Sequence, residues 1–528
     1  MRFVRALLLG RVHETTHMLN LRNISRAVVI GGGTAGWFSA LTLRRLFAPQ
    51  VEVRVIESPA IGIVGVGEGG LLNLIDALRR NGIGLNEFVR ETGAAFKLGF
   101  CYEGWRTGDD DDRYYHLFGR PGLQEIDWME AGFHPLLSGM VHEGIELHRY
   151  IPGFASIAIN ASQQQAAAML QLGESSGLSA SFHFDSHKLA DYLRRVAVSR
   201  GVVHQQARVE ELVCDAQGMA RAVRLEGAEE TVGLDLLIDA SGLARLGIGG
   251  KLGVRWRSFS EYLLLDRAVP FHMPHPEPNP SLVTRAIAMP AGWMWQIPLV
   301  ERVGAGYVFS SAHADEAQVV DEIHRRIGPG IEPMRTLRFE PGHFEQVWVG
   351  NVMAVGLASG FVEPLEATSI GQMLEQLRNF ERIVAAGDGV VAGHLIDDFN
   401  EANARCWSGI RDFLRMHYDC PRRDTAFWRD VSQLPLPSSY AELWACFQQR
   451  TPRMVDVQNY AINGWQGIFH VINWLFVAAP LGVVPREAAA AELQGLPSVS
   501  RARVAAYITR MRELGAAGNF SSKGDRSA

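Results

Sequence analysis

The sequence predicts an α/β fold for its first 430 residues or so and a mainly helical region after them. A short apolar run, residues 26–30, precedes a glycine-rich turn, a helical pattern and a second apolar run at residues 51–56. Two later apolar runs that end in small residues, 234–238 and 353–356, suit one large sheet assembled from distant segments. In the last third, the apolar residues recur at helical spacing.

Composition and chain ends bound the class of protein. The chain of 528 residues is 47% hydrophobic and 20% charged, and its net charge of -6 leaves no basic surplus for nucleic-acid binding. Its scattered cysteines form no CxxC pair, which predicts free thiols, a cytoplasmic protein and no metal. We expect a disordered leader over residues 1–25 and a flexible tail over 516–528. The apolar run 469–484 is shorter than the ~20 residues that a membrane-spanning helix needs.

The first strand, turn and helix carry a dinucleotide-binding pattern. Gly31, Gly33 and Gly36 form a GxGxxG, and Glu57 follows the last glycine by 21 residues at the end of the second strand. The three glycines suit a tight turn, a close approach of pyrophosphate and close helix packing, and Glu57 suits a ribose hydroxyl. The alternative is an ordinary glycine-rich turn, which would need neither the flanking strands nor the distal acid.

Further motifs follow in an order that resembles one family. They are GGGTAGW from residue 31, GVGEGG at 65–70, FK at 96–97, YHLFG at 115–119, FHFDSHKLADYL at 182–193, WMWQIP at 293–298 and GLASGFVEPLEATSI at 356–370. Together they resemble the flavin-dependent halogenases of the tryptophan-halogenase type. The resemblance covers roughly residues 26–430 and is weaker beyond.

The resemblance implies an FAD-binding, Rossmann-like fold of the two-dinucleotide-binding flavoprotein type. Residues 26–430 would form the FAD-binding module with substrate-binding insertions, and residues 431–515 a mainly helical region covering the substrate site, in a monomer or homodimer. A separate flavin reductase would supply reduced FAD, which with oxygen and chloride or bromide gives hypohalous acid. The implied cofactor-binding residues are Gly31, Gly33, Thr34, Ala35, Gly36, Glu57, Gly65, Val66, Gly67, Glu68, Leu357 and Ile370.

Two catalytic residues follow from the resemblance. Lys97 matches the family's essential lysine, which would either hydrogen-bond hypohalous acid or form a haloamine with it. The alternative is a surface lysine in the last turn of a helix that starts near residue 86. Glu366 matches the acidic partner that takes the proton lost from the aromatic ring or holds the hypohalous acid. Its alternative is a helix-stabilising glutamate in the first turn of the helix that begins near Thr368.

The residues after Glu366 depart from the usual pattern and imply an anion site. Ala367 stands where the family usually has Ser, which removes a hydroxyl beside Glu366, and Ser369 stands where Gly is usual. Thr368 and Ser369 open a helix whose free N–H groups suit a bound halide. Simple N-capping by Thr368 is the alternative.

Aromatic residues are expected around the substrate and the flavin. Trp293 and Trp295 alternate in a strand, so their indoles share one side, where the resemblance implies a stacked barrier between the flavin and the substrate. Core packing of the same two indoles is the alternative. His116 and Phe118, with Tyr115, match the family's aromatic walls around the substrate ring. His183, Asp185 and His187 look like a metal-binding set, but the family block they match is structural.

The last third lacks the groups expected for free tryptophan. The resemblance implies a Tyr-Tyr pair followed by Glu, whereas residues 450–485 contain one tyrosine, Tyr460, and no glutamate. A zwitterion buried there would lack partners. We therefore expect halogenation of indole, an indole derivative or another electron-rich aromatic. The alternatives are an FAD-dependent aromatic monooxygenase (a hydroxylase) and a non-catalytic flavin-binding protein.

Overall fold

The computed structural model describes residues 18–517 except 63, 64, 66, 120–134, 145 and 156–159. Residues 18–20, part of the predicted leader, form β1 (Met18–Asn20), which pairs antiparallel with β24 (Val390–Ala392). The predicted leader boundary at residue 25 is therefore wrong for residues 18–25. Its first part and the end of the predicted tail lie outside the described residues.

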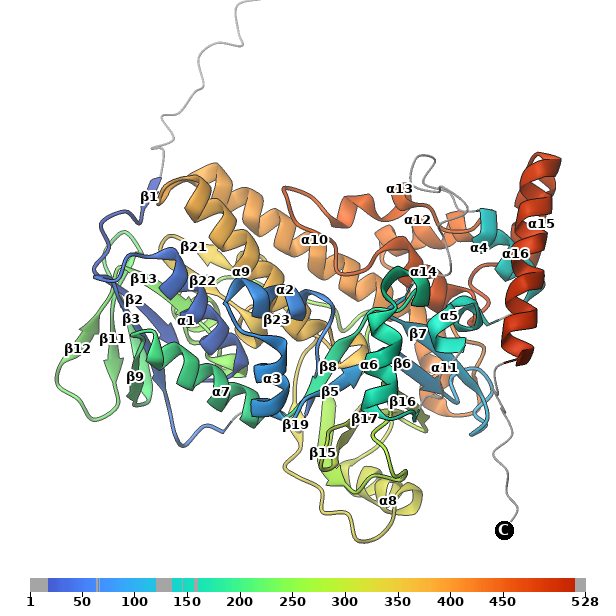
Figure 1. Ribbon diagram of the computed structural model, residues 1–528. Helices are drawn as coiled ribbons and strands as arrows, with labels where there is room; N and C mark the ends of the chain where they lie inside the picture. The colour runs from blue at the N-terminus through green and yellow to red at the C-terminus, as the bar shows by residue number, and fades with distance from the viewer. Residues whose placement is uncertain are drawn as a thin grey trace, which may run out of the picture.

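A six-stranded sheet lies on the left of the molecule in Figure 1, with spatial order β21-β22-β13-β2-β3-β9. Neighbouring strands run parallel except the edge pair β21 and β22. The strands are β2 (Arg26–Ile30), β3 (Glu52–Glu57), β9 (Val203–Gln206), β13 (Leu236–Asp239), β21 (Trp348–Val349) and β22 (Val352–Ala354). The prediction of one sheet assembled from distant segments is confirmed.

A seven-stranded sheet carries the WMWQIP motif in its central region. Its order is β19-β15-β18-β17-β16-β6-β7, and only β16 and β6 run parallel. The strands are β6 (Gly99–Glu103), β7 (Arg113–Leu117), β15 (Arg267–Met273), β16 (Val283–Met289), β17 (Gly292–Pro298), β18 (Val303–Phe309) and β19 (Leu337–Arg338).

Three further small sheets have the strand orders β4-β8-β5, β10-β11-β12 and β14-β20-β23. Their strands are β4 (Glu68–Gly69), β5 (Ala95–Lys97), β8 (Ser181–Phe184), β10 (Val209–Cys214), β11 (Ala220–Leu225), β12 (Thr231–Gly233), β14 (Trp256–Ser258), β20 (Gly342–Phe344) and β23 (Gly360–Phe361). The sheet β4-β8-β5 matters most here, because it joins the GVGEGG segment to the strand that ends at Lys97.

The last third is helical, as predicted, and α15 and α16 lie at the edge of the molecule farthest from β12 (Figure 1). The helices are α1 (Thr34–Leu46), α2 (Asn73–Arg80), α3 (Leu85–Thr92), α4 (Pro135–Glu143), α5 (Pro152–Ala155), α6 (Gln163–Gln171), α7 (Ser186–Ser199), α8 (Glu316–Arg326), α9 (Thr368–Ala386), α10 (Gly393–His417), α11 (Ala426–Gln433), α12 (Ser438–Phe447), α13 (Met454–Val457), α14 (Val471–Ala478), α15 (Arg486–Gly495) and α16 (Ser498–Ala517). Among the described helices, none has the length and apolar character to cross a membrane.

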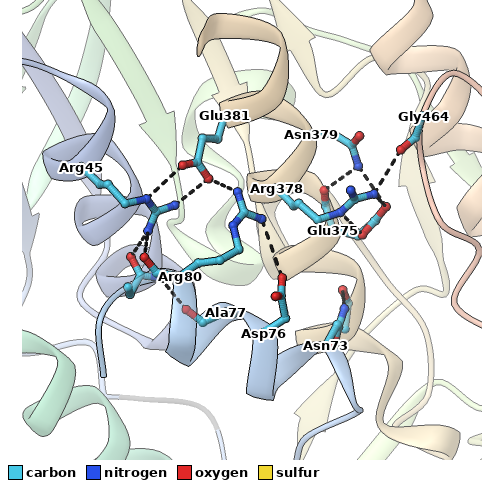
Figure 2. A network of polar contacts seen from close by, with 12 residues as sticks. Arg45, Asn73, Asp76, Ala77, Arg80, Glu375, Arg378, Asn379, Glu381 and Gly464 are labelled. Atoms are coloured by element: carbon cyan, nitrogen blue, oxygen red, sulfur yellow. Dashed lines mark hydrogen bonds and ion pairs between the residues drawn. The ribbon is translucent and has the colours of Figure 1, made fainter. Parts of the chain in front are cut away.

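Helix α9 is held on two sides by polar contacts to other segments, and its Glu375 and Arg378 also pair with each other (Figure 2). On one side Glu381 pairs with Arg45 of α1 and Arg80 of α2. On the other, Arg378 binds Glu375 and donates to the carbonyl of Gly464, 3.1 Å away. These contacts fix the helix whose first turn begins at Thr368.

Candidate functional site

A cavity of about 480 Å³ opens between the carboxyl ends of the parallel strands and one face of the seven-stranded sheet. This is where open α/β sheets bind ligands. The predicted cofactor residues on its wall are Gly31, Gly33, Thr34, Ala35, Glu57, Gly65, Gly67, Glu68, Leu357 and Ile370. Gly36 is not on the wall, and Val66 lies outside the described residues.

The three glycines of the GxGxxG meet three different surroundings. Gly31 has a φ of +109°, and a Cβ there would collide with the carbonyl oxygen of Ala240. A Cβ on Gly36 would collide with the carbonyl of Gly31, whereas one on Gly33 would meet nothing within 4 Å. The first glycine therefore permits the turn, the last permits helix packing, and the middle one leaves open space.

That open space suits a pyrophosphate. Gly33 is the N-cap of α1 and supplies no side-chain cap, so the first-turn N–H groups remain available for an anion. Glu57 ends β3 on the cavity wall, and its Oε1 lies 2.7 Å from Nε2 of His204. The backbone cradle and the distal acid both fit the dinucleotide implied by the sequence.

Glu68 brings a second carboxyl to the cavity wall. Burial raises the pKa of its side chain to about 7, and its Oε2 has no hydrogen-bond partner. The neighbouring Gly69 makes room for Lys97, because a Cβ there would lie 2.8 Å from the lysine Nζ. The GVGEGG segment thus touches both the cavity and the lysine.

Trp293 and Trp295 lie on the same side of β17 and both line the cavity. Their rings meet edge to face, with centroids 6.3 Å apart and planes at 65°, so the expectation of stacked indoles is wrong. Strand twist and the bare position at Gly306, opposite Trp295, explain the tilt, because a Cβ on Gly306 would collide with the Trp295 ring.

A buried carboxyl fixes the first of these indoles. Trp293 Nε1 donates to Glu363 Oε1 over 3.0 Å, and the hydroxyl of Tyr418 donates to the same oxygen over 2.5 Å. Burial raises the pKa of Glu363 to about 7, against the lowering effect of those two hydrogen bonds. The position of the Trp293 indole therefore depends on residues from two other parts of the chain.

Lys97 is buried in a strand and not in a helix. Gly93, with a φ of +62°, ends α3 after Thr92, and the chain then enters β5. The alternative of a surface lysine in a last helical turn is therefore wrong, since the Lys97 side chain is 0% exposed. Its Nζ has no hydrogen-bond partner and lies 3.9 Å from the ring centroid of Phe100.

The surroundings of Lys97 lower the pKa of its amine to about 7. Burial is the main cause, and the charge of Glu366 opposes it. Phe118, predicted as a substrate wall, has its ring centroid 5.4 Å from the same Nζ. An amine that titrates near neutral pH can serve either as ammonium or as nucleophile.

Glu366 lies at the centre of a buried hydrogen-bond cluster. It has a φ of +65° and precedes α9, so the alternative of a glutamate in the first turn of that helix is wrong. The hydroxyl of Tyr102 donates to Oε1, Nδ1 of His116 lies 2.8 Å from both oxygens, and Nε2 of His417 lies 3.2 Å from Oε1. Burial raises the pKa of Glu366, but His116 and His417, through their hydrogen bonds to the carboxylate, oppose burial and the pKa lies far below its usual range.

The start of α9 has free donors. Ala367, also left-handed with a φ of +52°, occupies the N-cap position and offers no side-chain cap. Thr368 does not cap the helix, which contradicts that alternative, and its buried Oγ1 has no partner. Ser369 lines the cavity. An anion there could therefore accept hydrogen bonds from the first-turn N–H groups of α9.

The histidine-rich block after β8 has separate local roles. His183 Nε2 lies 2.9 Å from Thr284 Oγ1, and Asp185 caps α7 through the N–H of His187 and of Lys188. These side chains do not converge, and no metal-binding group of three such residues is found among the described residues.

The sequence did not predict most of the side chains that hold Glu366, His116 and Trp293 in place. Tyr102, Glu363, His417, Tyr418 and Asn473 all contact the cluster or the barrier, yet they lie in four different segments. His417 and Tyr418 carry a recognisable signal, because they form an adjacent His-Tyr pair at the end of a long helical pattern. The others carry no spacing that points to Glu366.

Comparisons with known proteins agree on one family. A model described as tryptophan halogenase matches residues 26–494. The chain is 49% identical to y4xG of Sinorhizobium fredii, described as uncharacterized, over 94% of this chain and 97% of that protein. It is 32% identical to the tryptophan 7-halogenase KtzQ of Kutzneria sp. over 88% and 90% of the two chains. The solved structure of Xcc4156, a flavin-dependent halogenase from Xanthomonas campestris, matches with a TM-score of 0.78 at 29% identity, over 94% and 96%.

Proposed function

The chain belongs to the tryptophan halogenase family and is an FAD-dependent halogenase, and on this premise we propose that it halogenates indole or a related electron-rich aromatic. Lys97 and Glu366 are the proposed catalytic residues. The observation that carries this assignment is the buried, unpartnered amine of Lys97 directly behind Gly69 and Phe100, two residues of the cavity wall.

FAD would bind along the cavity wall described above. Its pyrophosphate would meet the N-terminus of α1 beside Gly33, and Glu57 would accept a ribose hydroxyl. When bound in the reduced form delivered by a separate reductase, it supplies the electrons with which oxygen and halide give hypohalous acid. The free N–H groups at the start of α9 would hold the chloride or bromide.

Lys97 would receive hypohalous acid from the cavity. As an ammonium it would donate a hydrogen bond and polarise the oxygen–halogen bond. As a neutral amine it would form a haloamine and release water, and attack by the ring would then return the amine. A pKa near 7 for Lys97 supports either route.

Glu366 would take the proton that the ring loses as the halogen replaces it. Its low pKa keeps the carboxylate ionised and therefore able to accept. Trp293 and Trp295 would keep the aromatic substrate away from the cofactor, because their indoles form part of the cavity wall. The 431–515 region would cover the substrate.

Polar residues in the segment 450–485 already have partners within the protein. This supports a substrate that has no amino-acid head group. Tyr460 donates to Asp412 over 2.6 Å and stacks on Trp474. Arg450 pairs with Asp456, and Arg453 pairs with Glu492. Because these groups are already paired, a buried ammonium or carboxylate of free tryptophan would find few partners in this segment.

The test is mass spectrometry of indole incubated with the protein, reduced FAD, oxygen and bromide. We expect bromoindole, and we expect Lys97→Ala to lower its formation at least about 1000-fold while oxygen consumption continues. Lys188→Ala, which removes an exposed lysine paired with Glu301, is the matched control. Hydroxyindole formed without halide, or free tryptophan outcompeting indole, would contradict the proposal.

A further inference from the structure

We propose that Asn473 is a positioning residue for halogenation: its amide fixes His116 as a neutral imidazole and leaves His417 to exchange protons with Glu366. The inference rests on the proposed function of Glu366 as the acceptor of the ring proton. It also changes the role predicted for His116, whose two nitrogens both point at other side chains.

The orientation of the Asn473 amide is set by the start of α14. His470 is the N-cap of that helix, and its backbone N–H donates to Asn473 Oδ1 over 2.7 Å. The carbonyl end of the amide is therefore committed to the cap, as in a capping box. The Nδ2 end, which can only donate, lies 2.8 Å from Nε2 of His116.

This contact decides the proton on His116. Because Asn473 donates to Nε2, that nitrogen must accept, and the ring proton must lie on Nδ1. Nδ1 lies 2.8 Å from both oxygens of Glu366, so the N–H donates to the carboxylate. His116 thus holds Glu366 as a neutral donor, and protonating its Nε2 would break the bond from Asn473.

His417 is in the opposite position. Its Nδ1 donates to the carbonyl of Phe413 over 2.8 Å, while Nε2 lies 3.2 Å from Glu366 Oε1. The hydroxyl proton of Tyr102 is already directed at Glu366. Nε2 of His417 therefore faces the ionised carboxylate without a proton of its own, and it can receive the proton that Glu366 takes from the ring.

Ionisable groups face Glu366 from four elements, and they differ in what they can exchange. Burial raises the pKa of Tyr102 and of Tyr114 well above the usual value, so both hydroxyls keep their protons. The groups are Lys97 on β5, Tyr102 on β6, Tyr114 and His116 on β7, and His417 on α10. With His116 fixed by Asn473, His417 is the imidazole that can take over the proton from Glu366.

The test is Asn473→Asp in the full chain. The aspartate can still accept from the His470 N–H, but it offers His116 an oxygen in place of a donor. Nitrogen-15 spectra of histidine-labelled protein should show the Nδ1–H tautomer of His116 in the parent, with the signal assigned by its loss in His116→Gln. In Asn473→Asp that signal should change to an imidazolium, because both ring nitrogens would then face a carboxylate.

Bromination of indole gives the second readout. We expect kcat of Asn473→Asp to fall about tenfold near pH 7, because a cationic His116 makes Glu366 a poorer base, and the deficit should shrink at higher pH. The control Asn463→Asp places the same charge at an exposed site in the preceding loop and should stay within about twofold.

Three results would overturn the inference. They are an Nε2–H tautomer of His116 in the parent, a His116 signal that Asn473→Asp leaves unchanged, and a kcat ratio that is the same at every pH. If the parent halogenates no aromatic, the proposed function fails, yet the tautomer measurement still decides the role of Asn473.

Discussion

The cofactor cavity and the cluster around Glu366 are built in opposite ways. On the cofactor side of the cavity, two glycine-rich turns, 31–35 and 67–69, supply much of the wall with their backbone. The cluster is made of side chains, since Glu366 is bound by Tyr102, His116 and His417 from three separate elements. A backbone site can be found from residue spacing, whereas a side-chain cluster depends on which elements pack together.

Substitution of Gly31 and of Gly33 should separate the two roles of the glycine turn, backbone conformation and space for a ligand. Gly31→Ala should lower the free energy of unfolding by about 3 kcal/mol, because it combines a positive φ with a collision at the Ala240 carbonyl. Gly33→Ala should leave stability within about 0.5 kcal/mol and weaken FAD binding about tenfold, because its Cβ would occupy only the open cavity. Thermal unfolding and flavin-fluorescence titration measure the two effects.

Equal losses of stability in the two variants would contradict the comparison. They would mean that the turn is sensitive throughout and that the open space beside Gly33 is not where a ligand approaches. A stable Gly31→Ala variant with normal FAD affinity would mean that the turn can be rebuilt without the positive φ.

The contrast also explains what could be predicted from the sequence. Residue spacing correctly predicted the sheet built from distant segments and the glycines that line the cavity. It also predicted that Trp293 and Trp295 lie on the same side of their strand. Residue spacing did not predict the end of the helix before Lys97. The helical pattern in the sequence continues past Gly93, whereas in the structure the left-handed Gly93 ends α3. Residue spacing also failed for the partners of Glu366, because hydrogen bonds between residues 51 to 264 positions apart leave no local pattern.

The second prediction uses the pH dependence of Lys97. Its pKa of about 7 lies below the usual lysine value, so the amine becomes neutral as pH rises through 7. Since Nζ has no hydrogen-bond partner that would hold an ammonium, we expect haloamine formation, and the rate should rise about tenfold from pH 6 to a plateau above 7. Bromoindole formation at saturating bromide between pH 6 and 9 measures it.

The opposite profile would assign a different role to the same residue. A rate that falls above pH 7 would indicate that an ammonium donates to hypohalous acid. Stability provides a check on the sign: the unfolded chain binds the lysine proton more tightly between pH 7 and 10.5, so stability should rise across that window. Lys97→Met should remove this rise.

The smallest expected effect concerns Ala367, which stands where the family usually has serine. Ala367→Ser restores the hydroxyl that is usual in the family beside Glu366, at a half-buried position on the cavity wall. We expect kcat for indole bromination to change by less than about twofold, because Glu366 already accepts from Tyr102 and His116. A gain of tenfold or more would mean that those side chains do not replace the missing hydroxyl, and that the local motif matters more here than the assembled cluster. Glu366→Gln, which should lower kcat about 100-fold, shows in the same assay that the carboxylate itself is being measured.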